Sequence, residues 1–205
     1  MCDSYSINIS ADRIISELEI SAEQETIAEK YRLNRNIEPG DIAPVLISKG
    51  EDRILRNYKW GIWNSKSQKY EMIARVESIK TSPLWKDAIK DKDSRCIIPA
   101  SSFFEWKVIS EEERVNVEIF HKSEELFAFA GIHLHYHENG KVIPGFAIIT
   151  VPASLEMTPV GDHQPGTIAK DDFDAWLEGS ADPIPLIRSE RGITFEIKSR
   201  IGSDS

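Results

Sequence analysis

The sequence has little cysteine and no long apolar run, and both absences exclude classes of protein. Its 205 residues include only Cys2 and Cys96, and neither belongs to a CxxC spacing, so we expect neither a disulfide framework nor a zinc site. No apolar run reaches the roughly 18 residues that a membrane span needs. The first residues also lack the basic-then-apolar pattern of a signal peptide. We therefore expect a cytoplasmic protein that does not enter a membrane.

Positive charge is scarce too, because the net formal charge is -9. A protein that coats nucleic acid with its whole surface needs an excess of Lys and Arg, so this class is excluded. Residues 49–95 differ, since they hold twelve basic and seven acidic residues, interleaved with Tyr58, Trp60, Trp63, Tyr70 and Trp85. This window is either a solvated basic face or, because bases stack on aromatic rings, a surface that binds single-stranded nucleic acid.

The pattern of apolar residues predicts one strand-rich α+β domain over residues 1–200, with a disordered tail at 201–205. Hydrophobic residues make up 40% of the chain, which is enough for one substantial core. Helical spacing predicts helices within 10–33 and at 82–90 and 170–178. Runs of β-branched and aromatic residues predict strands at 43–47, 60–63, 96–99, 103–106, 115–120, 126–134, 146–151 and 192–197.

Cys2 directly follows the initiator methionine. Removal of Met1 would make it the amino-terminal residue, with an α-amine of reference pKa about 8 and a thiol of about 8.5 on adjacent carbons. Such a pair can capture an aldehyde, first as a Schiff base and then as a five-membered thiazolidine. An amino-terminal Cys can also be the nucleophile of an amide hydrolase, with its own amine as the base. A cysteine without function at this position is the third interpretation.

Glu105 lies between Phe104 and Trp106 in a run that is predicted to be a buried strand. Alternation along the strand would place these two aromatic residues on one face and Glu105 on the other. A carboxyl group among aromatic rings has a raised pKa, which suits a general acid or base near neutral pH. The alternative is a structural role, in which Glu105 pairs with an arginine such as Arg75.

His133, His135 and His137 alternate along a predicted strand, so their side chains would share one face, as metal ligands do. The strand runs into the polar turn HENGK at 137–141, where histidines are exposed without any metal. We therefore expect no metal and no other cofactor.

Cys2 and seven longer segments form a recognisable series. These segments are RNIEPGDIAPVLI (35–47), WGIW (60–63), ARVES (74–78), RCIIPASSFFEW (95–106), FAFAGI (127–132), FAIITVPAS (146–154) and PGTIAKDDFDAWL (165–177). The chain resembles, over nearly its whole length, the SOS-response-associated peptidase (SRAP) family, whose members are also described as abasic-site processing proteins. The RCIIPASSFFEW block is the most specific part of the resemblance.

The resemblance implies a single α+β domain with a barrel-like, mixed β core and short flanking helices. It implies a monomer that binds abasic sites in single-stranded DNA and captures the ring-opened deoxyribose as a thiazolidine on Cys2. Glu105 would then move protons during ring opening and closure. Arg75 would contact phosphate near the lesion, with Glu77 orienting it. Further candidate DNA contacts are Trp63 and Asn36.

The chain departs from the family at two positions. Ile73 stands where the family has an asparagine, and Gly161 stands where it has a histidine. His163, two residues further on, is the candidate to take the catalytic place of that histidine. The alternative to a crosslinking protein is a non-catalytic module of the same fold that binds single-stranded DNA or a partner, and the second alternative is an amide hydrolase with an amino-terminal nucleophile.

Overall fold

The computed structural model describes residues 2–20, 31, 33, 35–50, 52–121, 126–189 and 195–199. Within this part, helix α1 (Ala11–Leu18) begins after the N-cap Ser10, whose hydroxyl accepts a hydrogen bond from the backbone N–H of Arg13. Ile14 and Leu18 are buried on one face of α1, as the spacing predicted. Residues 21–30 of the predicted helical segment and the predicted tail at 201–205 lie outside the described residues.

Five strands close into a barrel, which confirms the predicted barrel-like core. They are β3 (Ile42–Lys49), β4 (Asp52–Trp60), β8 (Arg95–Ala100), β11 (Phe127–Glu138) and β12 (Lys141–Pro152). The ring runs β11-β8-β3-β4-β12 and returns from β12 to β11. The β12–β4 pair is parallel and the others are antiparallel, so the barrel is mixed. All six residues of β8 are buried, including the charged Arg95.

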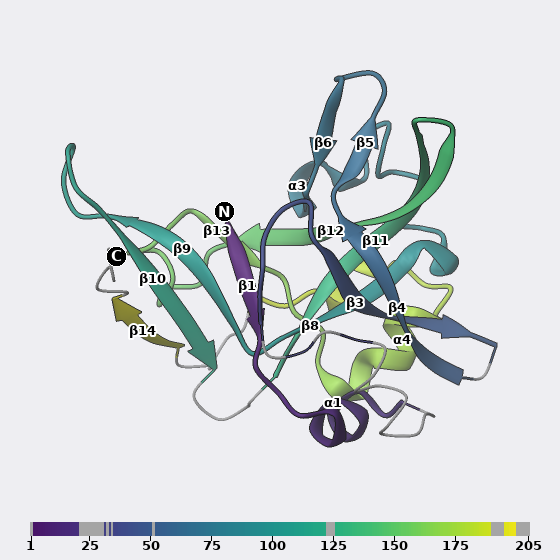
Figure 1. Cartoon of the computed structure of the whole chain (residues 1–205), viewed down its shortest axis with the longest axis horizontal. Coiled ribbons are helices and arrows are strands. Elements are labelled where there is room, and N and C mark those ends of the chain that lie inside the picture. The colour runs from purple at the N-terminus through teal and green to yellow at the C-terminus, as the bar shows by residue number, and fades with distance from the viewer. Residues whose placement is uncertain are drawn as a thin grey trace.

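A second, antiparallel sheet carries the start of the chain. Its strands lie in the order β14 (Phe195–Ser199), β10 (Arg114–His121), β9 (Ser102–Val108), β1 (Ser4–Ile7) and β2 (Arg35–Ile37). Strand β1 is therefore paired on both edges, with β2 and with β9. Figure 1 shows β9 and β10 leaving the barrel as a long hairpin, with β1 beside them. This pairing holds the residues next to Cys2 against the strand that contains Glu105.

Short elements complete the fold around the barrel. Strand β7 (Ile73–Arg75) runs parallel to β12, and β13 (His163–Pro165) pairs with the end of the same strand. A separate hairpin of β5 (Ile62–Asn64) and β6 (Lys69–Glu71) projects beyond the barrel (Figure 1). The remaining elements are α3 (Val76–Ile79), α4 (Phe173–Leu177) and the 3-10 turns η1 (Lys92–Ser94), η2 (Lys170–Asp172) and η3 (Ile184–Leu186).

Of the two short predicted helices, the one at 170–178 forms and the one at 82–90 does not. The segment 170–178 folds as η2 and α4, as predicted. The segment 82–90 forms a series of turns, in which the backbone N–H groups of Lys86 and Ile89 bond the carbonyls of Ser82 and Trp85 at 2.9 Å. Burial of Trp85 and Ile89 holds these turns against the core. Among the described residues, no helix is long and apolar enough to cross a membrane.

Most aromatic residues of the basic window 49–95 belong to the core. Trp60 is fully buried and stacks on Phe146 with ring centroids 6.3 Å apart. Tyr58 and Trp85 are 8% and 5% exposed. The rings of Trp60 and Tyr58 are therefore closed to base stacking, so the alternative of an aromatic binding surface is wrong for these two residues. Trp63, in contrast, is only partly buried.

Candidate functional site

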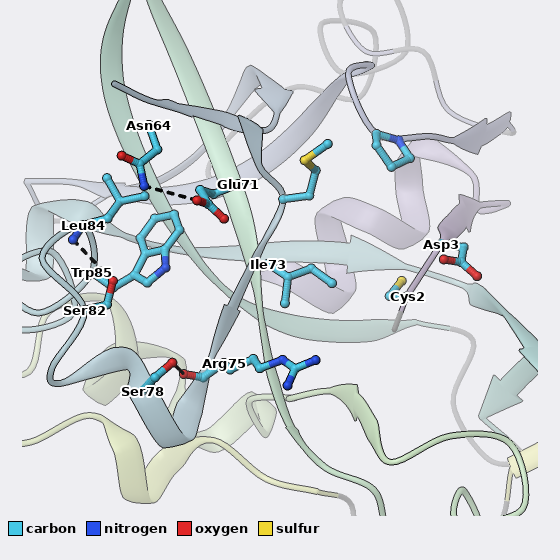
Figure 2. A pocket seen from close by; sticks show the side chains of 12 residues that line it. Cys2, Asp3, Asn64, Glu71, Ile73, Arg75, Ser78, Ser82, Leu84 and Trp85 are labelled. Carbon is cyan, nitrogen blue, oxygen red and sulfur yellow. Dashed lines mark hydrogen bonds between the residues drawn. The ribbon is translucent and has the colours of Figure 1, made fainter. Parts of the chain in front are cut away.

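A cavity of about 560 Å³ lies between the start of the chain and β7. We call it the Cys2 cavity. It brings Cys2 and Arg75 to one space, with Ile73 between Cys2 and Trp85 in the view of Figure 2. The residues that line it are Cys2, Asp3, Pro39, Asn64, Glu71, Met72, Ile73, Arg75, Ser78, Ser82, Leu84 and Trp85.

Backbone pairing places Cys2 beside Glu105. The N–H of Asp3 donates to the carbonyl of Phe104 at 3.2 Å, one residue out of the β1–β9 register, in which Phe104 is opposite Ser4. The thiol of Cys2 donates to the carbonyl of Ser4 at 3.5 Å. Cys2 and Glu105 are each 3% exposed. Two residues that are far apart in the sequence therefore share one buried corner of the site.

Burial on β9 does not follow the alternation that the sequence suggested. Phe103, Phe104 and Glu105 are all buried, whereas Trp106 is 49% exposed. The change follows the end of the β1–β9 pairing at Phe104, beyond which β9 continues as a hairpin with β10. The shared face predicted for Phe104 and Trp106 therefore does not mean shared burial, because the environment changes along the strand.

Burial changes the acidity of the Glu105 carboxyl and of the Cys2 thiol. Burial, together with the negative charges of Asp3 and Asp162, raises the pKa of the Glu105 carboxyl to about 7. Burial also raises the pKa of the Cys2 thiol, and the nearby charge of Glu105 adds to this effect. The carboxyl can therefore hold or release a proton near neutral pH, while the thiol at rest stays protonated. A dominant arginine partner would instead have lowered the pKa of Glu105.

Arg75 ends β7, and the parallel pairing of β7 with β12 places it opposite Thr150. Its side chain lines the Cys2 cavity (Figure 2). Helix α3 follows at once and carries Glu77, which is exposed. Burial acts to raise the pKa of Glu77, but a backbone hydrogen bond, its bond with His163 and the charge of Arg75 lower the pKa overall. Glu77 is thus a carboxylate on which the charge of Arg75 acts, while its side-chain hydrogen bond is with His163.

His163 lies at the start of β13, between two carboxylates. Its Nε2 atom is 2.8 Å from Oε1 of Glu77, and its Nδ1 atom is 3.2 Å from Oδ1 of Asp162. Neither His163 nor Glu105 is among the residues that line the Cys2 cavity, but the charge of Glu105 acts on the Cys2 thiol, whereas that of His163 does not. At Gly161, a Cβ atom would meet only the carbonyl of His163, 3.7 Å away, so the position has room for a side chain.

A second cavity, of about 470 Å³, continues from the first. We call it the Trp63 cavity. The two cavities share Asn64, Ser82 and Leu84 in their linings. The residues that line the Trp63 cavity are Trp63, Asn64, Ser65, Lys66, Ser67, Ser82, Pro83 and Leu84. No motif in the sequence indicated this space, because it forms between two turns that come together only in the fold.

The predicted DNA contact Asn36 lies outside both cavities, and the charges of several basic residues in the window 49–95 are paired with carboxylates. Asn36 is exposed on β2, accepts a hydrogen bond from the hydroxyl of Ser6 at 2.7 Å, and lines neither cavity. Several basic residues of the window 49–95 are bound in ion pairs. These pairs are Arg53 with Glu19 and Asp174, Lys59 with Glu138, Lys80 with Asp182, and Lys92 with Asp93.

His133 and His135 do share one face of β11, since both rings contact Tyr58, at centroid distances of 5.2 and 6.1 Å. Burial lowers the pKa of His133 to about 4, and the charge of His135 acts in the same direction. In the part of the chain that is described, no group of three or more His, Cys, Asp or Glu side chains is placed to hold a metal ion.

Two acidic residues at the site were missed by reasoning from the sequence. Asp3 and Asp162 both act on the pKa of Glu105. Asp3 is adjacent to Cys2, so its proximity could have been inferred from position alone. Asp162 comes near Glu105 only because β13 returns beside β12, and the sequence carries no signal of that approach.

Known proteins resemble the chain in sequence. The family model for SOS response associated peptidase (SRAP) matches residues 1–193. The chain is 32% identical over 184 residues to the abasic site processing protein YoaM of Bacillus subtilis (strain 168), covering 86% of this chain and 79% of that protein. It is 30% identical over 183 residues to YobE, another abasic site processing protein of the same organism, covering 86% and 82%.

Solved structures share the fold at lower identity. A protein from Bacteroides thetaiotaomicron superposes with a TM-score of 0.81 at 18% identity, covering 97% of this chain and 91% of that one. A protein from Bordetella bronchiseptica superposes with a TM-score of 0.79 at 15% identity, covering 97% and 99%. Since the family match extends over both cavities and all the strands of the barrel, the chain belongs to the SOS response associated peptidase (SRAP) family.

Proposed function

We propose that the protein binds single-stranded DNA at abasic sites and forms a covalent thiazolidine with the lesion through Cys2, after Met1 is removed. The observation that carries this proposal is the pairing of a buried Cys2 with a Glu105 carboxyl of pKa about 7 beside a cavity that Arg75 lines. The abasic site processing proteins YoaM and YobE are the relatives that support DNA as the partner.

The chemistry requires an acid that can also act as a base. The amine of Cys2 adds to the aldehyde carbon of the ring-opened deoxyribose and gives a carbinolamine. Protonated Glu105 donates a proton to the hydroxyl group, which leaves as water, and an iminium ion remains. The Glu105 carboxylate then takes the thiol proton, and the sulfur attacks the iminium carbon to close the ring. Glu105 ends protonated, as it began, and one water is released.

The pKa values of the Cys2 thiol and the Glu105 carboxyl suit these steps. A thiol whose pKa is raised by burial attacks slowly unless a base takes its proton. A carboxyl with a pKa of about 7 is present in both protonation states near neutral pH, which is the condition for efficient proton transfer in both directions. Arg75 lies in the same cavity and would bind the phosphate beside the lesion. In this scheme His163 acts through its bond with Glu77, as a positioning residue.

The test is crosslinking to a defined lesion. Protein with Cys2 confirmed as its first residue by intact mass is mixed with a single-stranded oligonucleotide in which one uracil has been excised. We expect a product that survives heating in a denaturing gel, with the mass of protein plus oligonucleotide minus one water. Cys2→Ala should abolish the product. Cys96→Ala is the matched control, because Cys96 is equally buried but lies in the barrel wall, and it should crosslink normally.

A specific observation favours a second candidate, a DNA-binding module without covalent chemistry. Ile73 and Gly161 remove two polar side chains that the family resemblance places at the site, and Ile73 presents an apolar surface to the Cys2 cavity. This candidate predicts retention of abasic oligonucleotide in a native gel but no product in the denaturing gel. Hydrolysis of an amide substrate in the absence of DNA would instead indicate the hydrolase.

A further inference from the structure

Charged side chains are unevenly spread around the Cys2 cavity. Among the described residues that line it, Arg75 is the one basic side chain, and Asp3 and Glu71 are the two acidic ones. In the view of Figure 2, Cys2 lies between Asp3 and the guanidinium group of Arg75. A sugar that reacts at Cys2 is therefore flanked by a positive group on one side and a negative group on the other.

The backbone fixes the position of Asp3. Its N–H group donates to the carbonyl of Phe104 at 3.2 Å, and the strand that follows is paired with β2 and β9. The side chain of Asp3 is exposed, and none of the basic residues that the structure describes forms an ion pair with it. Glu71, in contrast, accepts hydrogen bonds from Asn64 and Ser67 at 3.2 and 3.1 Å. Asp3 is therefore the carboxylate of the cavity that is open to a ligand.

The charge of Asp3 acts on the reacting groups. Burial is the main cause of the raised pKa of the Cys2 thiol, and the charges of Glu105 and Asp3 add to it. Burial is also the main cause of the raised pKa of Glu105, and Asp3 again acts in the same direction. The Asp3 carboxylate is thus within electrostatic range of the place where the sugar reacts. A phosphate at this end of the cavity would be repelled, because like charges at short range raise the free energy of binding.

Arg75 provides for a phosphate at the other end of the cavity. Its side chain is exposed there, and a guanidinium group binds one phosphate through two parallel hydrogen bonds. The charge of Arg75 also acts on the carboxylates of Glu77 and Asp162, so acidic groups surround it. An abasic residue inside a strand carries a phosphate on each side, whereas one at a strand end with a terminal hydroxyl carries a single phosphate. The charges of the cavity match the second form.

We propose that the site prefers an abasic sugar with a phosphate on one side only, as at the end of a broken strand, with that phosphate at Arg75 and the terminal hydroxyl at Asp3. This inference rests on the proposed function and specifies its substrate class. Asp3 accepts a hydrogen bond from the hydroxyl of a terminal sugar and repels the second phosphate of an internal one. The preference arises from charge and not from the neighbouring bases.

The first experiment changes the charge of one phosphate at a time. Three oligonucleotides of one sequence carry an internal abasic site, released from a caged precursor. One has both flanking phosphates charged, and the others have a neutral methylphosphonate on the 5′ or the 3′ side. Crosslinking rates are compared below saturation at low salt, where charges are screened least. We expect one neutral linkage to raise the rate about tenfold, because it removes repulsion by Asp3, and the other to lower it, because it removes the phosphate bound by Arg75.

The second experiment places the lesion at either end of the strand, with a hydroxyl group instead of the outer phosphate. The end that lacks the phosphate facing Asp3 should react about tenfold faster than the internal lesion. It should be the same side as that of the favourable methylphosphonate. Free 2-deoxyribose 5-phosphate, followed by intact mass, should react more slowly than this strand end, because it has no neighbouring nucleotides to hold it in the cavity.

Asp3→Asn assigns the effect to this carboxylate, since it keeps the backbone N–H and nearly the same size. The variant should crosslink the fully charged oligonucleotide about tenfold faster and at the same rate as the favourable methylphosphonate. Glu111→Gln removes the same charge from an exposed position that lines neither cavity, and it should change neither rate. If Asp3 acted only through the pKa of Glu105, Asp3→Asn would change all rates by one factor and leave their ratios the same.

The outcomes separate this inference from the proposed function. Equal rates with the three internal oligonucleotides, a loss with both methylphosphonates, or unchanged ratios in Asp3→Asn would overturn the preference for one phosphate. An equal rate with free 2-deoxyribose 5-phosphate would overturn the strand end as the substrate. Absence of product from every oligonucleotide would instead contradict the proposed function. Intact mass and circular dichroism check that each variant begins at Cys2 and is folded.

Discussion

The imidazole Nε2 of His163 lies 2.8 Å from the carboxylate Oε1 of Glu77, so the histidine that the sequence offered as a replacement catalytic group is bound at the neighbouring carboxylate. Oδ1 of Asp162 lies 3.2 Å from the other ring nitrogen, Nδ1. Because the hydrogen bond and charge of His163 lower the pKa of Asp162, the ring also stabilises that carboxylate. The position of His163 therefore indicates an organising role at the edge of the site.

His163→Ala should consequently have a small effect on chemistry. At saturating DNA we expect the crosslinking rate to fall by less than about threefold, since the His163 ring is bound to Glu77 and is not among the groups that shift the pKa of Cys2 or Glu105. A catalytic imidazole would be worth about 10² or more, so a loss of that size would restore the catalytic assignment. Asp162→Asn serves as the control that disturbs the same cluster while keeping the ring.

Glu105→Gln should slow crosslinking by about 10²-fold or more, because the amide can neither donate the proton to the departing water nor take the thiol proton. In the wild-type protein the rate should depend on pH with an inflection near the Glu105 pKa of about 7. The inflection should vanish in the variant. An identical pH profile in both proteins would exclude Glu105 as the titrating group.

The same substitution should raise stability at alkaline pH. The pKa of Glu105 is about 7 in the folded chain against a reference value of 4.5, so the fold favours the protonated carboxyl. Its contribution is fully present below about pH 4.5 and is lost as the pH rises through 7. The loss amounts to about 3 kcal/mol by pH 8. Urea unfolding of Glu105→Gln should therefore show little of this decline between pH 5 and pH 8.

Ile73→Asn should speed the reaction. Ile73 is partly buried at the wall of the Cys2 cavity, where an amide could hydrogen-bond the sugar hydroxyl groups. One such bond contributes about 0.5–1.5 kcal/mol, or roughly a two- to tenfold change in rate. Ile73→Val, which stays apolar, is the control. A slower Ile73→Asn with unchanged stability would show that the apolar wall itself assists the reaction.

Arg75→Ala should reduce the salt dependence of DNA binding. For single strands each neutralised phosphate contributes about 0.7 to the slope of log K against log salt concentration, and Arg75 lies in the Cys2 cavity where a phosphate would approach. Lys92→Ala removes a charge from the same basic window, but Lys92 pairs with Asp93 and lines neither cavity. Equal slopes in both variants would argue against a phosphate contact at Arg75.

The sequence was informative where a motif carried the chemistry. Cys2 and Glu105 were singled out by position and by their apolar neighbours, and the fold brings them together because β1 pairs with β9. The interpretation of Tyr58 and Trp60 as part of a binding surface was wrong. An aromatic residue in a basic segment has the same sequence pattern whether its ring is exposed or buried. The Trp63 cavity could not be predicted, because its walls come from two turns whose approach depends on the barrel.

The pairing of β1 on both edges has a consequence for the reaction rate. Because β2 and β9 hold the strand that begins two residues after Cys2, Cys2 is held in position when folding is complete. Most of the orientational freedom that two reactants lose on meeting is then lost before DNA arrives, and well-oriented groups can react as if present at very high effective concentration. A short peptide with the same first residues, free in solution, should capture the same aldehyde far more slowly.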